Sequence, residues 1–166
     1  MDGQSESAQT GSNRNIINAL DEEFARLHAR SCQLVKTTSI ENFYHAPKGM
    51  GRESTAQSVG ENLLRSAAAV EQTFGGITSN LWDDPFEWTL PENLSTRERL
   101  IEYLEEVEAT RKLAFNRFSR DSDLLKEVSV PSGETLALIS LLLETLIRAS
   151  DFQGRAAATQ RLVTDV

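Results

Sequence analysis

The sequence has few of the residues that build disulfide frameworks, metal clusters and recognisable catalytic motifs. Cys32 is the only cysteine among 166 residues, which excludes an intramolecular disulfide and a cysteine-based zinc cluster and fits a reducing compartment. The two histidines, His28 and His45, are too few for a histidine-rich metal site. Phosphate-binding glycine loops, G-x-S-x-G and H-E-x-x-H are all absent. The sequence therefore contains no self-evident active site.

Basic charge and long apolar runs are also scarce. The 25 acidic and 17 basic residues give a formal net charge of -8, and such a surface repels nucleic-acid phosphates and anionic lipids at long range. The longest apolar run, 136–147, is too short to span a bilayer and contains Glu144. The first residues lack the basic start and apolar core of a secretory signal. We therefore predict a cytoplasmic protein without nucleic-acid or membrane partners.

What is present is a globular composition with helical periodicity. Apolar residues make up 39% of the chain and charged residues 25%, which is typical of a folded domain. We predict a flexible polar tail over 1–12 and a single domain over 13–166. Four segments have the helical period, and no segment between them alternates convincingly as a strand does. The predicted fold is all-α, a four-helix bundle with long crossover loops.

Boundary signals place the first two predicted helices. The first begins near Asn13 or Asn15. Its apolar face comprises Ile16, Leu20, Phe24, Leu27, Ser31 and Leu34. The second opens with a capping box from Ser54 to Gln57 and stops at Gly75-Gly76, and its alanines 67–69 would let a neighbouring helix approach closely.

The last two predicted helices have different characters. The third begins with a capping box from Ser95 to Glu98. Its charged face is expected to be solvated, with Glu108 four residues before Lys112 as a favourable pair. The fourth begins after Pro131 and is so apolar on every side that other helices should enclose it. We expect it to continue through the glycine at 154, since the alanines 156–158 favour helix.

Two other groups of residues stand out. The connection between the second and third helices contains Trp82, Phe86 and Trp88, so it should fold back onto the bundle or bury itself in a second subunit, and we expect a homodimer.

Several charges interrupt the apolar faces of the helices, namely Glu71, Arg111, Glu144 and Arg148. Glu144 and Arg148 are spaced to form an ion pair. Either these charges reach solvent at the edge of the bundle, or they line a polar pocket inside it.

Two segments carry a more specific pattern. The first, LLRSAAAVE, spans 63–71 on the second predicted helix, and the second, RASDFQGRAAATQRL, spans 148–162 on the fourth. They resemble motifs of the DinB/YfiT-like four-helix proteins, which read L-L-x-H-I-A-D-A-E and H-x-x-x-H-R-G-Q followed by L-R-L. The second segment shares Gly154 and Arg161 with that motif. By this resemblance, Gly154 is kept because the helix packs closely there.

The resemblance implies a metal-dependent transferase or isomerase with three histidine ligands at the core of the bundle. In this chain Ser66, Arg148 and Phe152 stand at the three histidine positions. A neutral hydroxyl is a poor ligand, a guanidinium is cationic, and a phenyl ring has no lone pair. We therefore expect the scaffold to be kept without the metal and without another cofactor.

Two functions remain open at this point. In the first, the protein is a metal-free binding or interaction protein, and the former metal cavity near Ser66, Arg148 and Phe152 is either packed shut or accepts a small anionic or thiol ligand beside Arg148. In the second, it is a divergent enzyme. That enzyme would use His28, Glu71 or Glu144 as acid or base, with Arg148 holding a carboxylate substrate.

Overall fold

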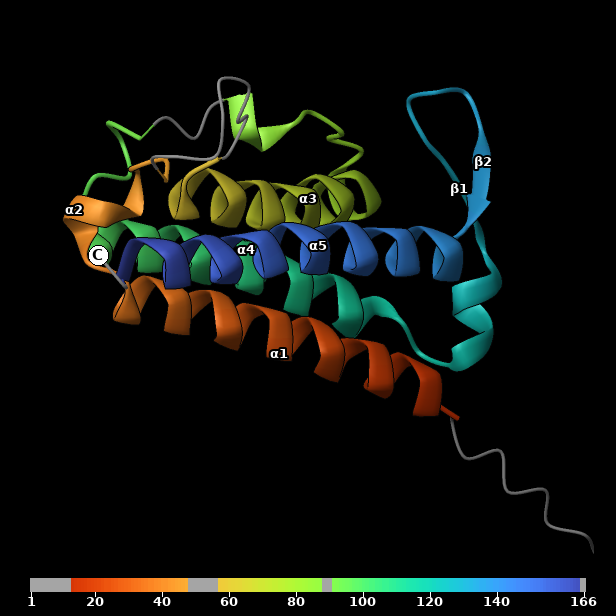
Figure 1. Cartoon of the computed structure of the whole chain (residues 1–166). Helices are drawn as coiled ribbons and strands as arrows, with labels where there is room; N and C mark the ends of the chain where they lie inside the picture. Colours follow the sequence, from red (N-terminus) through yellow and green to blue (C-terminus); the bar gives the residue numbers. More distant parts are fainter. Residues whose placement is uncertain (1–12, 48–56, 88–90, 165–166) are drawn as a thin grey trace, which may run out of the picture.

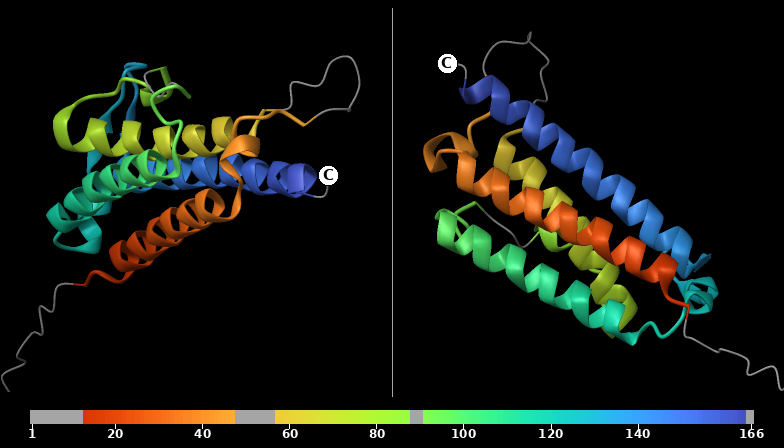
Figure 2. Two further views of the ribbon diagram at one scale, coloured as in Figure 1. Left: turned by 90° about the vertical axis from the view of Figure 1, so that its left-hand side faces the viewer. Right: turned by 90° about the horizontal axis from the view of Figure 1, so that it is seen from below.

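The fold is mostly helical, as predicted. The computed structural model describes residues 13–47, 57–87 and 91–164. The predicted tail at 1–12, Ser54 and Trp88 lie outside this part of the chain. Four long helices lie side by side (Figures 1 and 2): α1 (Asn15–Thr37), α3 (Val59–Ser79), α4 (Arg97–Arg117) and α5 (Leu138–Thr164). The shorter elements are α2 (Ile40–Phe43), the 3-10 helices η1 (Pro85–Glu87) and η2 (Asp121–Leu125), and the strands β1 (Glu127–Ser129) and β2 (Thr135–Ala137).

Aromatic side chains from three helices meet in the core. The rings of Phe24, Phe74 and Phe115, from α1, α3 and α4, lie 5.1 to 5.9 Å apart between centroids, the spacing that favours edge-on and tilted contacts. The predicted apolar face of α1 is buried except for Ile16, which is 49% exposed. Ile17 is buried in its place, because it lies seven residues, about two turns, before the buried Phe24 and so shares its side of the helix more closely than Ile16 does.

The observed N-termini of the helices show that two of the predicted N-caps are wrong. The α1 helix begins at Asn15, as predicted, and the Asp121 carboxylate accepts hydrogen bonds from its Ile16 and Ile17 N–H groups. The capping box of α3 is formed by Ser58 and Glu61, so the prediction that this helix opens at Ser54 with Gln57 is wrong. The α4 cap is also displaced by one residue: the Thr96 hydroxyl, and not that of Ser95, accepts from the Arg99 N–H.

Gly75 and Gly76 do not end α3, which continues to Ser79 and is capped by Asn80 in the left-handed conformation, with φ 55°. The reason for a glycine at 76 is packing. A Cβ built there would lie 2.4 Å from the Trp82 ring. Because glycine has no side chain, the indole of Trp82 can pack directly against the backbone of α3. Trp82 and Phe86, whose segment 81–87 we call the aromatic connection, therefore lie against α3, with the Arg65 guanidinium 4.0 Å over the Phe86 ring.

A small antiparallel hairpin precedes α5, contrary to the prediction that no strand lies between the helices. Its two strands pair Glu127 with Ala137 and Ser129 with Thr135. Gly133 supplies the positive φ of 85° that its turn requires. Strands of three residues are too short to show an alternating pattern. Because the hairpin occupies this connection, α5 begins at Leu138 and not directly after Pro131 as predicted.

The α5 helix continues through Gly154, as predicted, but the close packing predicted there is wrong. A Cβ built on Gly154 meets nothing within 4 Å. The helix is also not enclosed on every side, since Leu143 is 43% exposed and Ile147 is 69% exposed. None of the described helices combines the length and apolarity that crossing a bilayer requires.

Gly76 and Gly154 give a matched pair of substitutions. Gly154→Ala should raise the free energy of unfolding by about 0.5–1 kcal/mol, since alanine favours helix and fills open space. Gly76→Ala should lower it, because forcing the Trp82 ring off α3 costs about 1–3 kcal/mol, which exceeds the helix-propensity gain. Denaturant unfolding measures both effects. Equal stabilisation by the two substitutions would contradict the proposed contact between Trp82 and Gly76.

Candidate functional site

The residues singled out from the sequence lie in separate places in the structure. Ser66 and His28 line a small void inside the helices, and Arg148 and Glu144 line a larger cavity beside the hairpin. Glu71 is half-buried against Tyr103. Phe152 is half-buried elsewhere on α5, with the Arg155 guanidinium 5.5 Å from its ring centre. The six residues therefore do not converge on one site.

The interior near Ser66 is almost completely filled. The void lined by Ser66 and His28 has a volume of only about 20 Å³. The Ser66 hydroxyl donates a hydrogen bond of 2.8 Å to the Ala149 carbonyl. Gln153, rather than Phe152, points into this region from α5, and its amide donates to the Leu27 carbonyl at 2.7 Å and the Ser31 hydroxyl at 2.8 Å. This interior has no room for a ligand.

The three positions that the family resemblance assigns to a metal do not suit one here. Ser66 already donates its proton to a carbonyl, Arg148 is an exposed cation, and Phe152 offers no lone pair. Arg148 and Ser66 also line different spaces. The residues present therefore do not fit a metal at these positions.

A buried ionic network lies on the other side of the small void. Arg111, which is 2% exposed, donates two hydrogen bonds of 2.7 Å to the Glu108 carboxylate and a further one to Asp21. Burial disfavours the charged carboxylate, but Arg111 outweighs it and holds the pKa of Glu108 below its ordinary value. Lys112 lies 3.4 Å from Glu108 as predicted, yet Glu108 belongs to the interior and not to a solvated face.

The larger space, which we call the hairpin cavity, lies between α3, α5, the hairpin and the aromatic connection. Its volume is about 290 Å³, close to the lower end of the range of about 300–1,000 Å³ typical of small-molecule sites. Its lining residues are Ala69, Gln72, Thr73, Trp82, Val130, Pro131, Glu134, Leu136, Leu141, Glu144, Thr145 and Arg148. Half of these twelve residues are apolar and half are polar, and three of the polar ones are charged, so the cavity offers both apolar surface and groups that can orient a ligand.

Hydrogen bonds fix the walls of the hairpin cavity. The Gln72 side-chain amide donates to the Trp82 carbonyl at 2.8 Å, which ties the aromatic connection to α3. The Thr145 hydroxyl donates to the Leu141 carbonyl at 2.8 Å. Since a hydroxyl has one proton, the 2.7 Å contact between Thr73 and Thr145 must be a hydrogen bond donated by Thr73. The α3 and α5 walls are thus joined to each other.

The charged groups of the hairpin cavity are left open to solvent. Arg148, Glu144 and Glu134 are all exposed. Among the described residues, neither Arg148 nor Glu144 has an ion-pair partner within 4 Å, so the ion pair predicted between them is not formed in this part of the chain. The cation of Arg148 therefore lines the cavity without being paired to a carboxylate of residues 13–47, 57–87 or 91–164.

Glu71 lies outside the hairpin cavity and accepts a hydrogen bond of 2.7 Å from the Tyr103 hydroxyl on α4. Burial raises the pKa of Glu71 above its ordinary value of 4.5, and the charge of Glu106 adds to the effect, while the Tyr103 hydrogen bond opposes it. Burial and the Glu71 charge also raise the pKa of Tyr103. This pair links α3 to α4.

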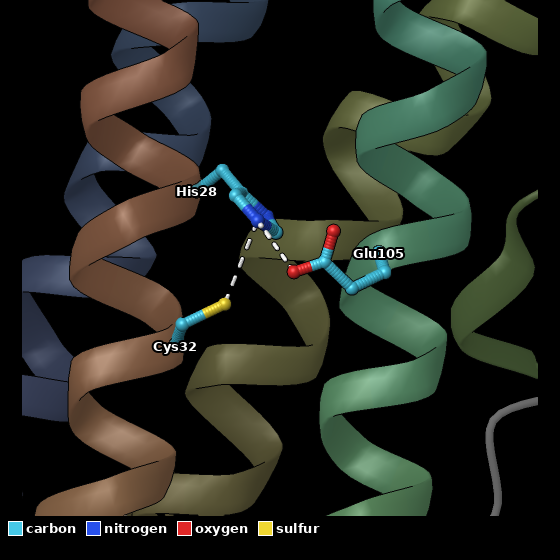
Figure 3. Close-up of side chains that lie close together, drawn as sticks. All are labelled: His28, Cys32 and Glu105. Carbon is cyan, nitrogen blue, oxygen red and sulfur yellow. Dashed lines mark hydrogen bonds and ion pairs between the residues drawn. The ribbon is translucent and has the colours of Figure 1, made fainter.

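A cluster that sequence reasoning missed lies where α1 and α4 face each other (Figure 3). The His28 Nε2 atom is 3.6 Å from the Cys32 Sγ atom and 3.3 Å from a Glu105 carboxylate oxygen. Burial, together with the charge of Glu105, raises the pKa of the Cys32 thiol. Four-residue spacing on one helix was the available signal for His28 and Cys32. Nothing in the sequence pairs them with Glu105, which is 73 positions further along the chain.

Comparisons with known proteins found no match to this chain: no protein-family model, no curated protein and no solved structure matches it. The function of the sites must therefore be argued from their own chemistry.

The half-buried Glu71 carboxyl predicts a pH-dependent contribution to stability. Because the pKa of Glu71 is higher in the folded protein, the folded protein keeps the carboxyl proton of Glu71 at pH values where the unfolded chain has lost it. The stabilisation is therefore complete below the ordinary pKa of 4.5 and is lost as the pH rises through the higher folded value. Glu71→Gln, which keeps an acceptor for Tyr103, should remove this loss. Denaturant unfolding as a function of pH measures it.

The exposed Glu102 on α4 provides a matched control for this experiment. Glu102→Gln should leave the pH profile of the unfolding free energy unchanged. If Glu71→Gln and the wild-type protein lose stability in parallel as the pH rises above 4.5, the carboxyl of Glu71 is not perturbed as described.

Proposed function

We propose that this protein binds a small organic anion, with an apolar body and one carboxylate, in the hairpin cavity. The observation that carries the proposal is that Arg148, an exposed cation lining a partly apolar cavity, has no ion-pair partner among the described residues. A guanidinium binds a carboxylate through two parallel hydrogen bonds. Trp82, Leu136 and Leu141 offer apolar surface for the rest of the ligand.

The charges around Arg148 favour a single negative charge on the ligand. Glu144 and Glu134 line the same cavity, so its three charged groups sum to a net negative charge. Repulsion by the two carboxylates disfavours a phosphate or another polyanion. The volume of the cavity, about 290 Å³, limits the ligand to a small molecule.

We further propose that the scaffold is a divergent four-helix bundle of the DinB/YfiT-like kind, acting in the cytoplasm. The two segments that carry the resemblance lie on α3 and α5. The Ser66 hydroxyl on α3 donates to the Ala149 carbonyl on α5, and both helices line the hairpin cavity. The proximity of the two segments supports this proposal. Binding in the cavity uses side chains and needs no metal at the three positions.

Benzoate and benzamide give a direct test, since they have similar shapes and differ in charge. Benzoate should bind and raise the melting temperature, while benzamide should bind more weakly. Arg148→Ala should weaken benzoate binding by about tenfold or more, because a hydrogen bond to a charged group is worth about 1.5–3 kcal/mol. Isothermal titration calorimetry on the full chain measures both affinities.

Arg155→Ala is the matched control. Arg155 lies two turns further along α5, paired with Asp151 at 2.7 Å, and does not line the hairpin cavity. Its removal should leave benzoate affinity unchanged. Equal affinities for benzoate and benzamide, or equal losses in Arg148→Ala and Arg155→Ala, would refute binding of an anion at Arg148.

A further inference from the structure

The cluster of His28, Cys32 and Glu105 presents three different metal-binding atoms to one point between α1 and α4 (Figure 3). His28 and Cys32 are four residues apart on α1, the spacing that puts two ligands on one face of a helix. Glu105 reaches the same point from α4. An imidazole nitrogen, a thiol sulfur and a carboxylate oxygen therefore all lie within 4.8 Å of one another.

The distances match the edges of a zinc coordination tetrahedron. Zinc binds sulfur at about 2.3 Å and nitrogen or oxygen at about 2.0–2.2 Å. With tetrahedral angles, these lengths place nitrogen and sulfur about 3.6 Å apart, and nitrogen and oxygen about 3.4 Å apart. The His28 nitrogen is 3.6 Å from the Cys32 sulfur and 3.3 Å from the Glu105 oxygen. Two of the three edges are already formed.

The third edge, between Cys32 and Glu105, closes by movement of a surface side chain. The atoms concerned lie no more than 4.8 Å apart, and the tetrahedral separation of sulfur and oxygen is again about 3.6 Å. The Glu105 side chain is 60% exposed, so it can rotate without moving its helix. The two α1 ligands, in contrast, are held in place by packing, since Cys32 is 8% exposed.

We propose that His28, Cys32 and Glu105 form a binding site for one zinc ion, with the fourth coordination position open to solvent. The mixed set of nitrogen, sulfur and oxygen donors suits zinc, because magnesium and calcium prefer oxygen alone. Three protein ligands with an open position are the arrangement of zinc sites that bind an exchangeable water. The exposed side of Glu105 is the path by which the ion enters.

This site is separate from the one that binds the organic anion. It lies between α1 and α4, whereas the hairpin cavity is lined by α3, α5, the hairpin and Trp82. It also shares no residue with the three positions of the family resemblance. The expectation from the sequence that no cysteine-based zinc cluster exists concerned clusters of several cysteines, and this site needs only one.

The absorption spectrum of Co²⁺ bound in place of zinc shows both the coordination geometry of the ion and whether sulfur is a ligand. The full chain, purified with a chelator and then freed of it, should take up one zinc ion per chain by calorimetry. Substituting Co²⁺ should give the intense visible bands of a tetrahedral ion and a thiolate charge-transfer band in the near ultraviolet. Cys32→Ser should abolish the charge-transfer band, since it removes the sulfur.

Because Cys32 is buried, a surface ligand provides the second variant. Glu105→Gln changes an exposed side chain and should leave the metal-free melting temperature unchanged, while weakening zinc binding by at least about tenfold. Loss of a residue that merely supports a ligand already costs about 10–100-fold. His45→Gln and Glu102→Gln are the controls, since both residues are exposed and outside the cluster. Neither should alter zinc binding.

Two results would overturn the zinc site. One is a wild-type cobalt spectrum without the charge-transfer band. The other is zinc affinity in Glu105→Gln equal to that of the wild-type protein, which would mean that the ion binds elsewhere on the acidic surface. Arg148→Ala should bind zinc normally, and Glu105→Gln should bind benzoate normally, so failure of either site is distinguishable from failure of the other.

Discussion

The close contact between α3 and α5 is the constraint on which the rest of the structure depends. Alanines 67–69 on α3 and Ala149 on α5 are buried, and such small side chains let two backbones approach until a hydroxyl on one reaches the other. Ser66 donates to the Ala149 carbonyl and Thr73 to the Thr145 hydroxyl, at 2.8 and 2.7 Å. The two bonds fix the helices in an antiparallel register. That register sets where the hairpin, which leads into α5, meets α3.

The hairpin cavity follows from this register. The hairpin supplies one wall, and Trp82, seated on Gly76, supplies another. Deeper in the molecule, Gln153 and the network of Glu108 and Arg111 fill the space between the helices. The hairpin cavity stays open at one end of the α3–α5 pair, where Arg148 has no ion-pair partner in the part of the chain that the structure describes. The polar groups between the helices are used in internal hydrogen bonds and ion pairs. The exposed charged groups that line the hairpin cavity are available to bind a ligand.

The sequence alone was sufficient for the existence of the four long helices and for the continuation of α5 through Gly154, because both depend on local periodicity and propensity, but not for the ends of α3 or the start of α5. It was insufficient wherever a distant residue decides the outcome. Gly76 is explained by Trp82, Asp21 adds a distant partner to the local pair of Arg111 and Glu108, and the neighbour of His28 on α4 is Glu105. Arg148 was identified because a charge on an apolar helix is visible locally. The shape of the cavity beside it depends on the hairpin, whose strands are too short to be recognised.

The most direct test of the central claim, that the hairpin cavity is a ligand site, is a crystal structure of the protein grown with benzoate. Electron density for the ring should lie between Trp82 and the hairpin, with both carboxylate oxygens at the Arg148 guanidinium. The chain offers a clear alternative location in the groove of about 360 Å³ between α1 and α5, which is lined by Arg30 and Gly154. Benzoate bound in that groove, with the hairpin cavity empty, would contradict the account.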